Sequence, residues 1–374
     1  MAVDALSRPA PDRQDDQDAA VLAGQLFTAA LACAELMAGY LGLELGLYEA
    51  MREPGTSAQL AERAGVHERY AREWLEQQAA GGTLRVDDAR RPAALRAFHL
   101  PPGHARALLD PASSHYSAPL ALLPVGSMTG VLPRLAEAFR RGTGIADQHF
   151  AGFHGGGLNA ALYEQQLPGW LRQELPDVHR RLATAAHPCI ADLACGTGAS
   201  TIELARAYPR ARVDGYDLDR SALRQARQRL DGQPDLASRA RFLEADISEL
   251  STVDAYDLVC AFDSLHDMAQ PVAALRACRR LVAEHGCVLL LEPRAQERFT
   301  APADLMERFI YACSLLHCLP IGISGAATAG DGGAATGAVL RPAMLRGFAA
   351  QAGFSAMHVL AGGSRFHRLY RLDP

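Results

Sequence analysis

The chain is poor in aromatic residues and has no large excess of charge of one sign. Aromatic residues make up 6% of its 374 residues, and the hydrophobic 49% is mostly Ala and Leu, which favours helices over an all-β fold. A formal net charge of −5 provides no general attraction to nucleic-acid phosphates or to anionic lipids. At this length we expect a soluble, globular chain of two or three domains.

The cysteines do not form the pattern of a disulfide-rich secreted protein. The eight of them include no CxxC pair, and most lie in apolar runs, as Cys260 and Cys287 do, where a free thiol behaves as a small hydrophobe. Residues 1–18 lack the basic segment and adjoining apolar core of a signal peptide, and they predict a disordered tail. Reduced thiols without a targeting signal predict a cytoplasmic protein.

One apolar stretch, residues 19–51, is longer than a transmembrane helix needs to be. Gln25, Glu35 and Glu44 interrupt it, and an ionised carboxylate at bilayer depth costs ~2.5–3.5 kcal/mol. We therefore expect a helix buried in a core or in a dimer interface, and a homodimer formed through the N-terminal helices.

Residues 19–110 predict a winged-helix and dimerisation domain. Residues 56–59 (Thr-Ser-Ala-Gln) have the form of a capping box, and Gly65 ends the short helix that follows. A second helix is expected over residues 67–80, with an inward face of Tyr70, Trp74 and Leu75. Strand-like residues 83–86, a turn and a second strand near Leu100 complete the helix, turn, helix and wing.

The expected recognition helix is not basic. Between residues 56 and 91 the charges of six arginines and six acidic residues cancel. Residues 67–80 carry three acidic residues, Glu68, Glu73 and Glu76, but only two arginines, Arg69 and Arg72. Affinity for DNA depends mainly on cations that neutralise phosphates. We therefore expect a dimerisation and substrate-lid module, and we expect nucleic acid not to be a partner.

Residues 186–374 predict an α/β domain, preceded by a helical linker over residues 111–185. Apolar strands alternate with amphipathic helices, which implies a parallel sheet covered by helices on both faces. The strands are expected near 189–194, 212–217, 240–245, 256–262, 286–292, 355–361 and 366–372. The short turn at residues 361–364 should make the last strand antiparallel to its neighbour.

The first of these strands runs into a glycine turn with acidic residues around it. Gly196 and Gly198 allow a tight turn at the positive end of the next helix. Asp192 lies within the strand, and Asp217 and Asp246 come at the ends of the second and third strands. Three carboxylates at the carboxyl edge of one sheet favour a site for a nucleoside cofactor that also carries an ammonium group.

A nicotinamide dehydrogenase is the rival interpretation of this turn. Its fingerprint requires a third glycine at position 201, where the chain has Thr201. It also has no use for a carboxylate at position 192, and the closing strand pair disfavours it further.

The run Asp-Leu-Ala-Cys-Gly-Thr-Gly at residues 192–198, with Asp217, Asp246 and residues 256–268, resembles the class I S-adenosylmethionine-dependent methyltransferases. With the N-terminal half, the chain resembles the actinobacterial-type winged-helix methyltransferases, some of which are labelled transcriptional regulators. The resemblance covers residues 20–374. It implies a Rossmann-like sheet with an antiparallel last strand, preceded by a mainly helical winged-helix domain.

The resemblance also implies how S-adenosylmethionine is bound. Asp192 and the turn at residues 196–198 would hold the methionine end, Asp217 the ribose, and Asp246 with Ile247 the adenine. The remaining expected contacts are Ala194, Leu218 and Phe262. Ala194 departs from the superfamily, which often has glycine there, and we expect this alanine to be sterically mild.

His266 and Asp267, which follow the fourth strand, are the expected catalytic residues. The Leu-His-Asp segment resembles that of plant-type small-molecule O-methyltransferases, whose histidine is the general base. The structural alternative is a histidine that caps the next helix. The expected reaction is methyl transfer to a small-molecule acceptor, at a hydroxyl group.

A second hypothesis adds His317, which lies in an apolar insertion suited to a substrate lid. His266, Asp267 and His317 would make a site for iron(II) or another divalent metal that chelates a keto or hydroxy acid, for C- or O-methylation. Two further alternatives are an S-adenosylmethionine-sensing DNA-binding regulator and a cofactor-binding domain that has lost catalysis.

Overall fold

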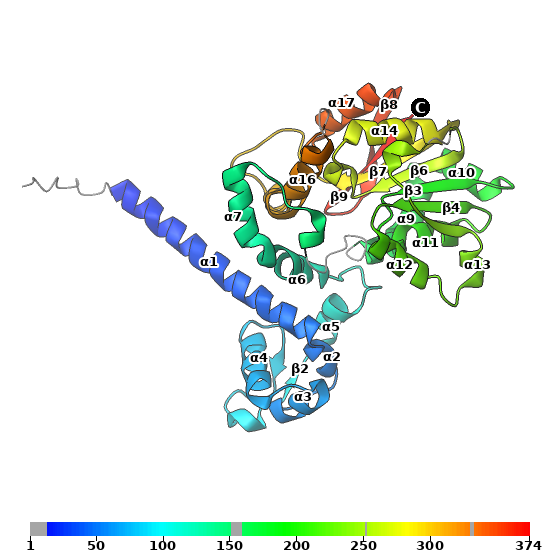
Figure 1. The fold of residues 1–374 in the computed structure, drawn as a ribbon. Coiled ribbons are helices and arrows are strands. Elements are labelled where there is room, and N and C mark those ends of the chain that lie inside the picture. The colour runs from blue at the N-terminus through cyan, green and yellow to red at the C-terminus, as the bar shows by residue number, and fades with distance from the viewer. Residues whose placement is uncertain (1–12, 151–158, 251–252, 330–332) are drawn as a thin grey trace, which may run out of the picture. The chain divides into compact units, whose positions relative to one another are not determined.

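The computed structural model describes residues 13–150, 159–250, 253–329 and 333–374, which fall into two compact units (Figure 1). The units are Met1–Val125 and Gly126–Pro374, and the chain passes between them in the π-helix η2 (Leu123–Met128). This boundary lies inside the segment 111–185 that was expected to be a linker.

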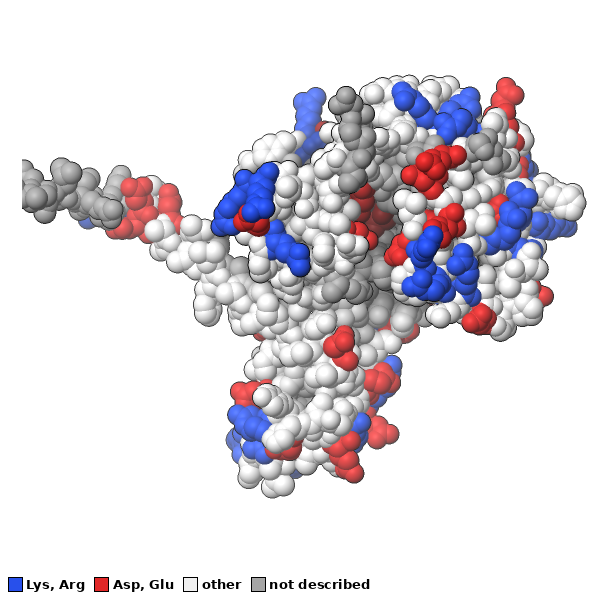
Figure 2. Space-filling model, in the orientation of Figure 1, with Lys and Arg blue, Asp and Glu red and all other residues white. Residues whose placement is uncertain are grey.

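The N-terminal unit begins with the helix α1 (Arg13–Glu44), so residues 13–18, expected in a disordered tail, are helical. Residues 1–12 lie outside the described part of the chain. Most of α1 is exposed, including the large apolar side chains of Val21, Leu22, Leu26, Phe27, Leu31, Met37 and Leu41. Figure 2 shows few charged side chains along this helix beyond its acidic start. Burial in the core of the same chain is therefore confined to the C-terminal end of α1.

The capping box and the two helices after it form as expected. Thr56 Oγ1 accepts from the backbone N–H of Gln59, and the backbone N–H of Thr56 donates to Gln59 Oε1 at 2.8 Å. The helix α3 (Ser57–Ala64) ends at Gly65, which has φ of 66°. The rest of the unit comprises α2 (Leu47–Ala50), α4 (Glu68–Ala80), β1 (Arg85–Val86), η1 (Ala93–Leu95), β2 (Phe98–His99), α5 (Pro102–Leu109) and α6 (Pro119–Leu122).

The inward orientation expected of Tyr70 is wrong, because its side chain is 79% exposed. The buried stripe of α4 consists of Ala71, Trp74, Leu75 and Gln78. One residue turns a helix by about 100°, so this stripe leaves position 70 at its solvent edge. Trp74 packs edge-on against Tyr48 of α2, with 5.0 Å between ring centroids.

The C-terminal unit contains the seven-stranded sheet expected from the sequence. Its spatial order is β5-β4-β3-β6-β7-β9-β8, and β9 runs antiparallel to both of its neighbours, as expected. The strands are β3 (Cys189–Leu193), β4 (Arg212–Asp217), β5 (Ala240–Glu244), β6 (Tyr256–Phe262), β7 (Val282–Pro293), β8 (Ala356–Gly363) and β9 (His367–Asp373).

Helices cover both faces of this sheet (Figure 1). Successive residues of a strand point to opposite faces, so Ile190 packs with α9, α10 and α11 while Ala191 packs with α14 and α17. The helices of the unit are α7 (Leu132–Arg141), α9 (Ala160–Glu174), α10 (Pro176–Thr184), α11 (Ala199–Ala207), α12 (Arg220–Gln228), α13 (Pro234–Ala237), α14 (Pro271–Leu281), α15 (Leu305–Cys313), α16 (Leu319–Ala329) and α17 (Pro342–Ala352).

Within the described part of the chain, two helical stretches, Arg13–Glu44 and Leu305–Ala327, are long and apolar enough to cross a membrane when judged by length and composition alone. The apolar window of the first is wholly exposed, and that of the second is one-third buried.

Candidate active site

The carboxyl ends of the parallel strands bring the predicted site residues to one edge of the sheet. Strand β3 pairs with β4 on one side and with β6 on the other, and β4 pairs with β5. Asp217 is the last residue of β4, Asp246 follows β5, and His266 lies in the 3-10 helix η6 (Leu265–Asp267) after β6. A switch point in strand order such as this is where open α/β sheets bind ligands.

The turn after β3 has backbone in the left-handed region at three positions. Gly196 has φ of 53° and Gly198 has φ of 78°. A Cβ added to Gly198 would lie 2.5 Å from the ring of Phe242, so no other residue fits there. Ala194 also has φ of 53°, a conformation that costs an L-residue roughly 1–2 kcal/mol. An alanine at position 194 therefore carries a small backbone cost that a glycine would avoid.

Asp192 is buried in β3, with 1% of its surface exposed. The hydroxyls of Ser200 and Thr201 donate to its Oδ2 at 2.7 and 2.6 Å. Burial raises the pKa of Asp192 to about 6, although the two hydroxyl donors oppose the increase. Within the described residues no group donates to Oδ1, which leaves that oxygen for an ammonium group.

Thr201 therefore has a role that the sequence analysis missed. In the sequence, Thr201 stands out only because it breaks a dinucleotide-binding fingerprint. The Ser-Thr pair directly after the glycine turn was the signal, because the first turn of α11 carries both hydroxyls back toward β3.

Asp217 holds the glycine turn in place. Its Oδ2 accepts from the backbone N–H of Gly196 at 2.7 Å, and its Oδ1 accepts from that of Asp219 at 2.8 Å. Burial raises the pKa of Asp217, against the effect of these backbone donors. This carboxylate therefore links the end of β4 to the turn after β3.

The other expected cofactor contacts differ in their surroundings. Leu218 is exposed, while Asp246 and Ile247 are half-buried after β5, and Ile247 packs against the core between the sheet and α14. Phe262 is buried, and its ring lies 5.6 Å from that of Tyr163 of α9. Phe262 thus packs in the core between the sheet and α9.

His266 is buried and held by a carboxylate that the sequence analysis did not select. Its Nδ1 lies 2.6 Å from Glu292 Oε2 in β7, and the backbone N–H of Leu265 donates to Glu292 Oε1 at 3.0 Å. Although burial lowers it, the negative charges of Asp267 and Glu292 raise the pKa of His266 well above its ordinary value. The missed signal was a glutamate directly after the apolar run of β7.

A second histidine–carboxylate pair lies at the same edge. Asp263 follows β6, accepts from Asn159 Nδ2 at 2.7 Å and lies 3.4 Å from His367 Nε2. Although burial favours its protonated form, His367 and Asn159 help to hold the pKa of Asp263 below its ordinary range. Neither Asp263 nor His367 was singled out in the sequence.

The hypothetical metal ligands do not all converge. Across the described ranges, one group of three ligand-type side chains comes together, namely His266, Asp267 and Cys318. His317, the residue before Cys318 in the π-helix η7 (Ser314–Cys318), instead packs against Phe150, with 4.6 Å between ring centroids. Burial lowers the pKa of His317 to about 4.

Comparison with known families finds one match within each of the two units. Residues 191–288 match the methyltransferase domain, and residues 32–109 match the Rv2258c-like winged helix-turn-helix domain. Among curated relatives, the ubiquinone/menaquinone biosynthesis C-methyltransferase UbiE of Syntrophotalea carbinolica is 33% identical over 145 residues. That match covers 38% of this chain and 56% of the relative. The chain spans about half the length of the curated relatives it matches.

Solved structures resemble the whole chain in fold. The mitomycin 7-O-methyltransferase MmcR has a TM-score of 0.63 at 20% identity, with 96% of this chain and 99% of that chain covered. Human N-acetylserotonin methyltransferase, solved in complex with S-adenosylmethionine, has a TM-score of 0.65 at 16% identity, with 98% and 99% covered. The chain therefore has the fold of the S-adenosylmethionine-dependent methyltransferases, with a methyltransferase domain matched over residues 191–288 and a winged helix-turn-helix domain matched over residues 32–109.

Proposed function

We propose that this protein transfers the methyl group of S-adenosylmethionine to a hydroxyl group of a small molecule. The observation that carries the proposal is a buried histidine, His266, whose Nδ1 is bonded to the buried Glu292 at the sheet edge that also holds the glycine turn. A hydroxyl acceptor needs a group that removes its proton during the transfer, and a histidine held in one orientation meets that need.

The residues of the edge suit the cofactor. Asp192 Oδ1 would accept from the ammonium group, the turn at residues 196–198 would hold the methionine end, and Asp217 would accept from the ribose hydroxyls. Asp246 and Ile247 would contact the adenine, with Ala194, Leu218 and Phe262 at the margins of the site. The bound cofactor supplies an already activated methyl group, so the protein's part is to align the acceptor and to take its proton.

In this proposal Nε2 of His266 accepts the hydroxyl proton after the imidazolium, which the raised pKa of His266 favours, has lost its own proton from Nε2. Glu292 acts as a positioning residue, because a carboxylate on Nδ1 keeps the proton of the neutral imidazole on Nδ1 and leaves Nε2 as the acceptor. The same carboxylate stabilises the imidazolium that forms when the acceptor loses its proton.

S-adenosylhomocysteine should raise the thermal unfolding midpoint by roughly 5–10 °C at about 100 times its dissociation constant. Such a concentration stabilises a one-site protein by about 2.7 kcal/mol, and about 1 kcal/mol shifts a domain of this size by about 2–4 °C. Thermal-shift titration measures the effect, with NADH as the comparison ligand. Asp217→Asn should remove the shift, whereas Glu244→Gln, at the end of the neighbouring strand, should keep it. A shift with NADH instead would contradict the proposal.

The uncovered helix α1 supports a homodimer formed through the N-terminal helices. Large apolar side chains exposed on one helix are typical of an interface, and Leu26 and Phe27 are among them. The double variant Leu26→Glu, Phe27→Glu should convert a dimer to a monomer in light scattering coupled to size-exclusion chromatography. The exposed Leu95, in the same unit but outside α1, provides the control Leu95→Glu. A wild-type monomer would refute the proposal.

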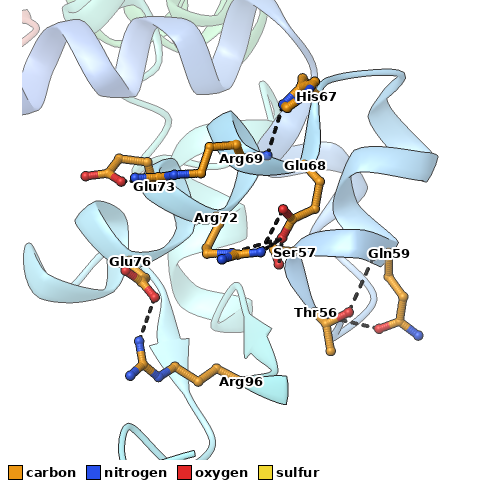
Figure 3. A network of polar contacts seen from close by, with 10 residues as sticks. All are labelled: Thr56, Ser57, Gln59, His67, Glu68, Arg69, Arg72, Glu73, Glu76 and Arg96. Carbon is orange, nitrogen blue, oxygen red and sulfur yellow. Dashed lines mark hydrogen bonds and ion pairs between the residues drawn. The ribbon is translucent and has the colours of Figure 1, made fainter. Parts of the chain in front are cut away.

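A DNA-binding regulator is the second candidate, because a winged helix-turn-helix family matches residues 32–109. Figure 3 shows the arginines of α4 engaged with neighbouring glutamates: Arg69 lies 2.6 Å from Glu73, and Arg72 lies 2.7 Å from Glu68. These pairs leave little positive charge for phosphates, so we favour the enzyme. Duplex DNA should bind no more tightly than the non-specific range of about 10⁻⁴–10⁻⁶ M at physiological salt. Fluorescence anisotropy measures this affinity for duplex DNA, and a nanomolar dissociation constant would support the DNA-binding regulator instead.

The eight cysteines are all free, which supports a reducing compartment, and we place the protein in the cytoplasm. Fractionation of the native host would test this placement, and recovery of the protein from a membrane or secreted fraction would contradict it.

A further inference from the structure

Three side chains from two segments far apart in sequence converge beside the proposed base. His266 and Asp267 belong to η6, and Cys318 ends η7 about 50 residues later. One ligand atom from each lies within 4.8 Å of the others, and His266 Nε2 and Asp267 Oδ1 are 3.5 Å apart. Tetrahedral zinc with bonds of about 2.0–2.3 Å requires ligand separations of roughly 3.3–3.6 Å. A small movement of side chains would complete that geometry.

His266, Asp267 and Cys318, called the trio below, receive few hydrogen bonds from the protein at their ligand atoms. Asp267 Oδ1 is buried and has no hydrogen-bond partner among the described residues. The sulfur of Cys318 lies within 4.8 Å of a ligand atom of His266 and of Asp267. A buried carboxylate oxygen without a donor is costly, and a cation between it and an imidazole nitrogen would remove that cost.

The surroundings of His266 also match those of a metal ligand. Its Nδ1 is bonded to Glu292, and histidines that bind metals usually donate their other ring N–H to a carboxylate in this way. Asp267 is partly exposed, which provides a route for an ion from solvent. A thiolate together with an imidazole selects zinc over magnesium or calcium.

We propose that His266, Asp267 and Cys318 bind Zn²⁺, and that the bound ion occupies the Nε2 atom which the methyl-transfer reaction needs as its proton acceptor. On binding, the Cys318 thiol releases its proton to water and its sulfur bonds to zinc, while the lone pair of His266 Nε2 and an Asp267 oxygen form the other two bonds. Water completes the four-coordinate site. Zinc is thus an inhibitor that competes for the base. The inhibition rests on the proposed function, whereas the binding does not.

Cobalt(II) is the probe for binding, since it takes the same ligands and a cobalt–thiolate bond absorbs in the near-ultraviolet. The full-length protein, freed of metal, should develop this absorption with one equivalent of Co²⁺ and lose it when Zn²⁺ is added. Cys318→Ala should weaken binding at least 10-fold and abolish the absorption. Cys313→Ala, five residues earlier and outside the trio, is the matched control and should bind as the wild type does.

Methyl transfer is then measured in the same three proteins with and without one equivalent of Zn²⁺. Zinc should inhibit the wild type and Cys313→Ala at least 10-fold, and should leave Cys318→Ala active. Absence of the absorption in the wild type, or its persistence in Cys318→Ala, overturns the site. Equal inhibition of all three proteins overturns the competition. If the metal-free wild type transfers no methyl group, the proposed function fails while the cobalt titration still tests the site.

If Cys318→Ala does not fold, Asp267→Asn provides the second variant for the cobalt titration. It should also weaken Co²⁺ binding at least 10-fold, and wild-type affinity in this variant would overturn the site.

Discussion

Replacing Asp192 with Asn should stabilise the ligand-free protein at pH 7 by up to about 3 kcal/mol and weaken S-adenosylhomocysteine binding roughly 10- to 100-fold. Burial raises the pKa of Asp192 to about 6, against 3.8 for the ordinary carboxyl group. A difference of one unit between the folded and unfolded pKa corresponds to about 1.36 kcal/mol of unfolding free energy. Ionised Asp192 therefore destabilises the folded state at neutral pH. Both hydroxyl donors bond to one oxygen, Oδ2, so the single carbonyl oxygen of Asn can accept both.

The sign of this effect depends on pH. Below the unfolded pKa the carboxyl group is protonated in both states and the substitution should change little. As pH rises through the folded pKa the wild type loses the stability that the protonated acid provided, and the variant does not. Urea unfolding at pH 4 and pH 7 measures the unfolding free energy of both proteins. The advantage of Asp192→Asn over the wild type should be larger at pH 7.

Asp214→Asn is the matched control, because Asp214 is a fully buried carboxylate on the neighbouring strand. It is paired with Arg241 at 2.7 Å and accepts from the Tyr256 hydroxyl at 2.9 Å. Removing a paired buried charge leaves its partners uncompensated and should destabilise the protein by about 3 kcal/mol. If Asp192→Asn is also less stable than the wild type at pH 7, then Asp192 is a structural carboxylate and the cofactor role loses its support.

Replacing His266 with Gln should lower kcat roughly 10²- to 10⁴-fold and leave S-adenosylhomocysteine affinity within about 2-fold of the wild type. That range is the usual contribution of a general base. Glutamine is similar in length and its amide can still donate to Glu292, but it cannot take up a proton. Methyl transfer to a panel of small hydroxylated acceptors and calorimetric titration of the cofactor product measure the two quantities separately.

Glu292→Gln should give a smaller loss, about 10- to 100-fold in kcat with little change in KM. The amide can still accept from the backbone of Leu265 but no longer supplies a charge to the imidazolium. His285→Gln is the control, since His285 is exposed and lies 3.1 Å from Asp257 away from the trio. Near-normal turnover of His266→Gln with intact cofactor binding would remove the base role and leave His266 as a buried structural histidine.

The features that the sequence alone predicted are those set by local chemistry. The capping box at Thr56 and Gln59 needs only residues three apart, and the strands around Asp192 and Asp217 follow from short apolar runs with turns between them. Since parallel strands end at one edge, the position of both carboxylates followed from the strand pattern alone. The antiparallel last strand followed from the short turn before it.

Tertiary packing decided which side of an element faces a neighbour. Helical spacing predicted that Tyr70 points inward, yet the adjacent Ala71 is the buried residue. Residue type made His317 a candidate ligand, yet the adjacent Cys318 is the one that lies with His266 and Asp267. One position rotates a helix by about 100°, and only packing against other elements sets that rotation. Glu292 illustrates the same limit, because no local rule joins it to His266, 26 residues earlier.

The sequence by itself therefore determined the fold class, the glycine turn and the acidic residues at the sheet edge, because periodicity, turns and strand ends are local properties of the chain. Only the tertiary structure decided the partners of His266, the hydroxyl pair that holds Asp192 and the thiol that joins the candidate zinc site. Those contacts depend on how helices are rotated and packed after the sheet has formed, and residue type alone does not specify that rotation.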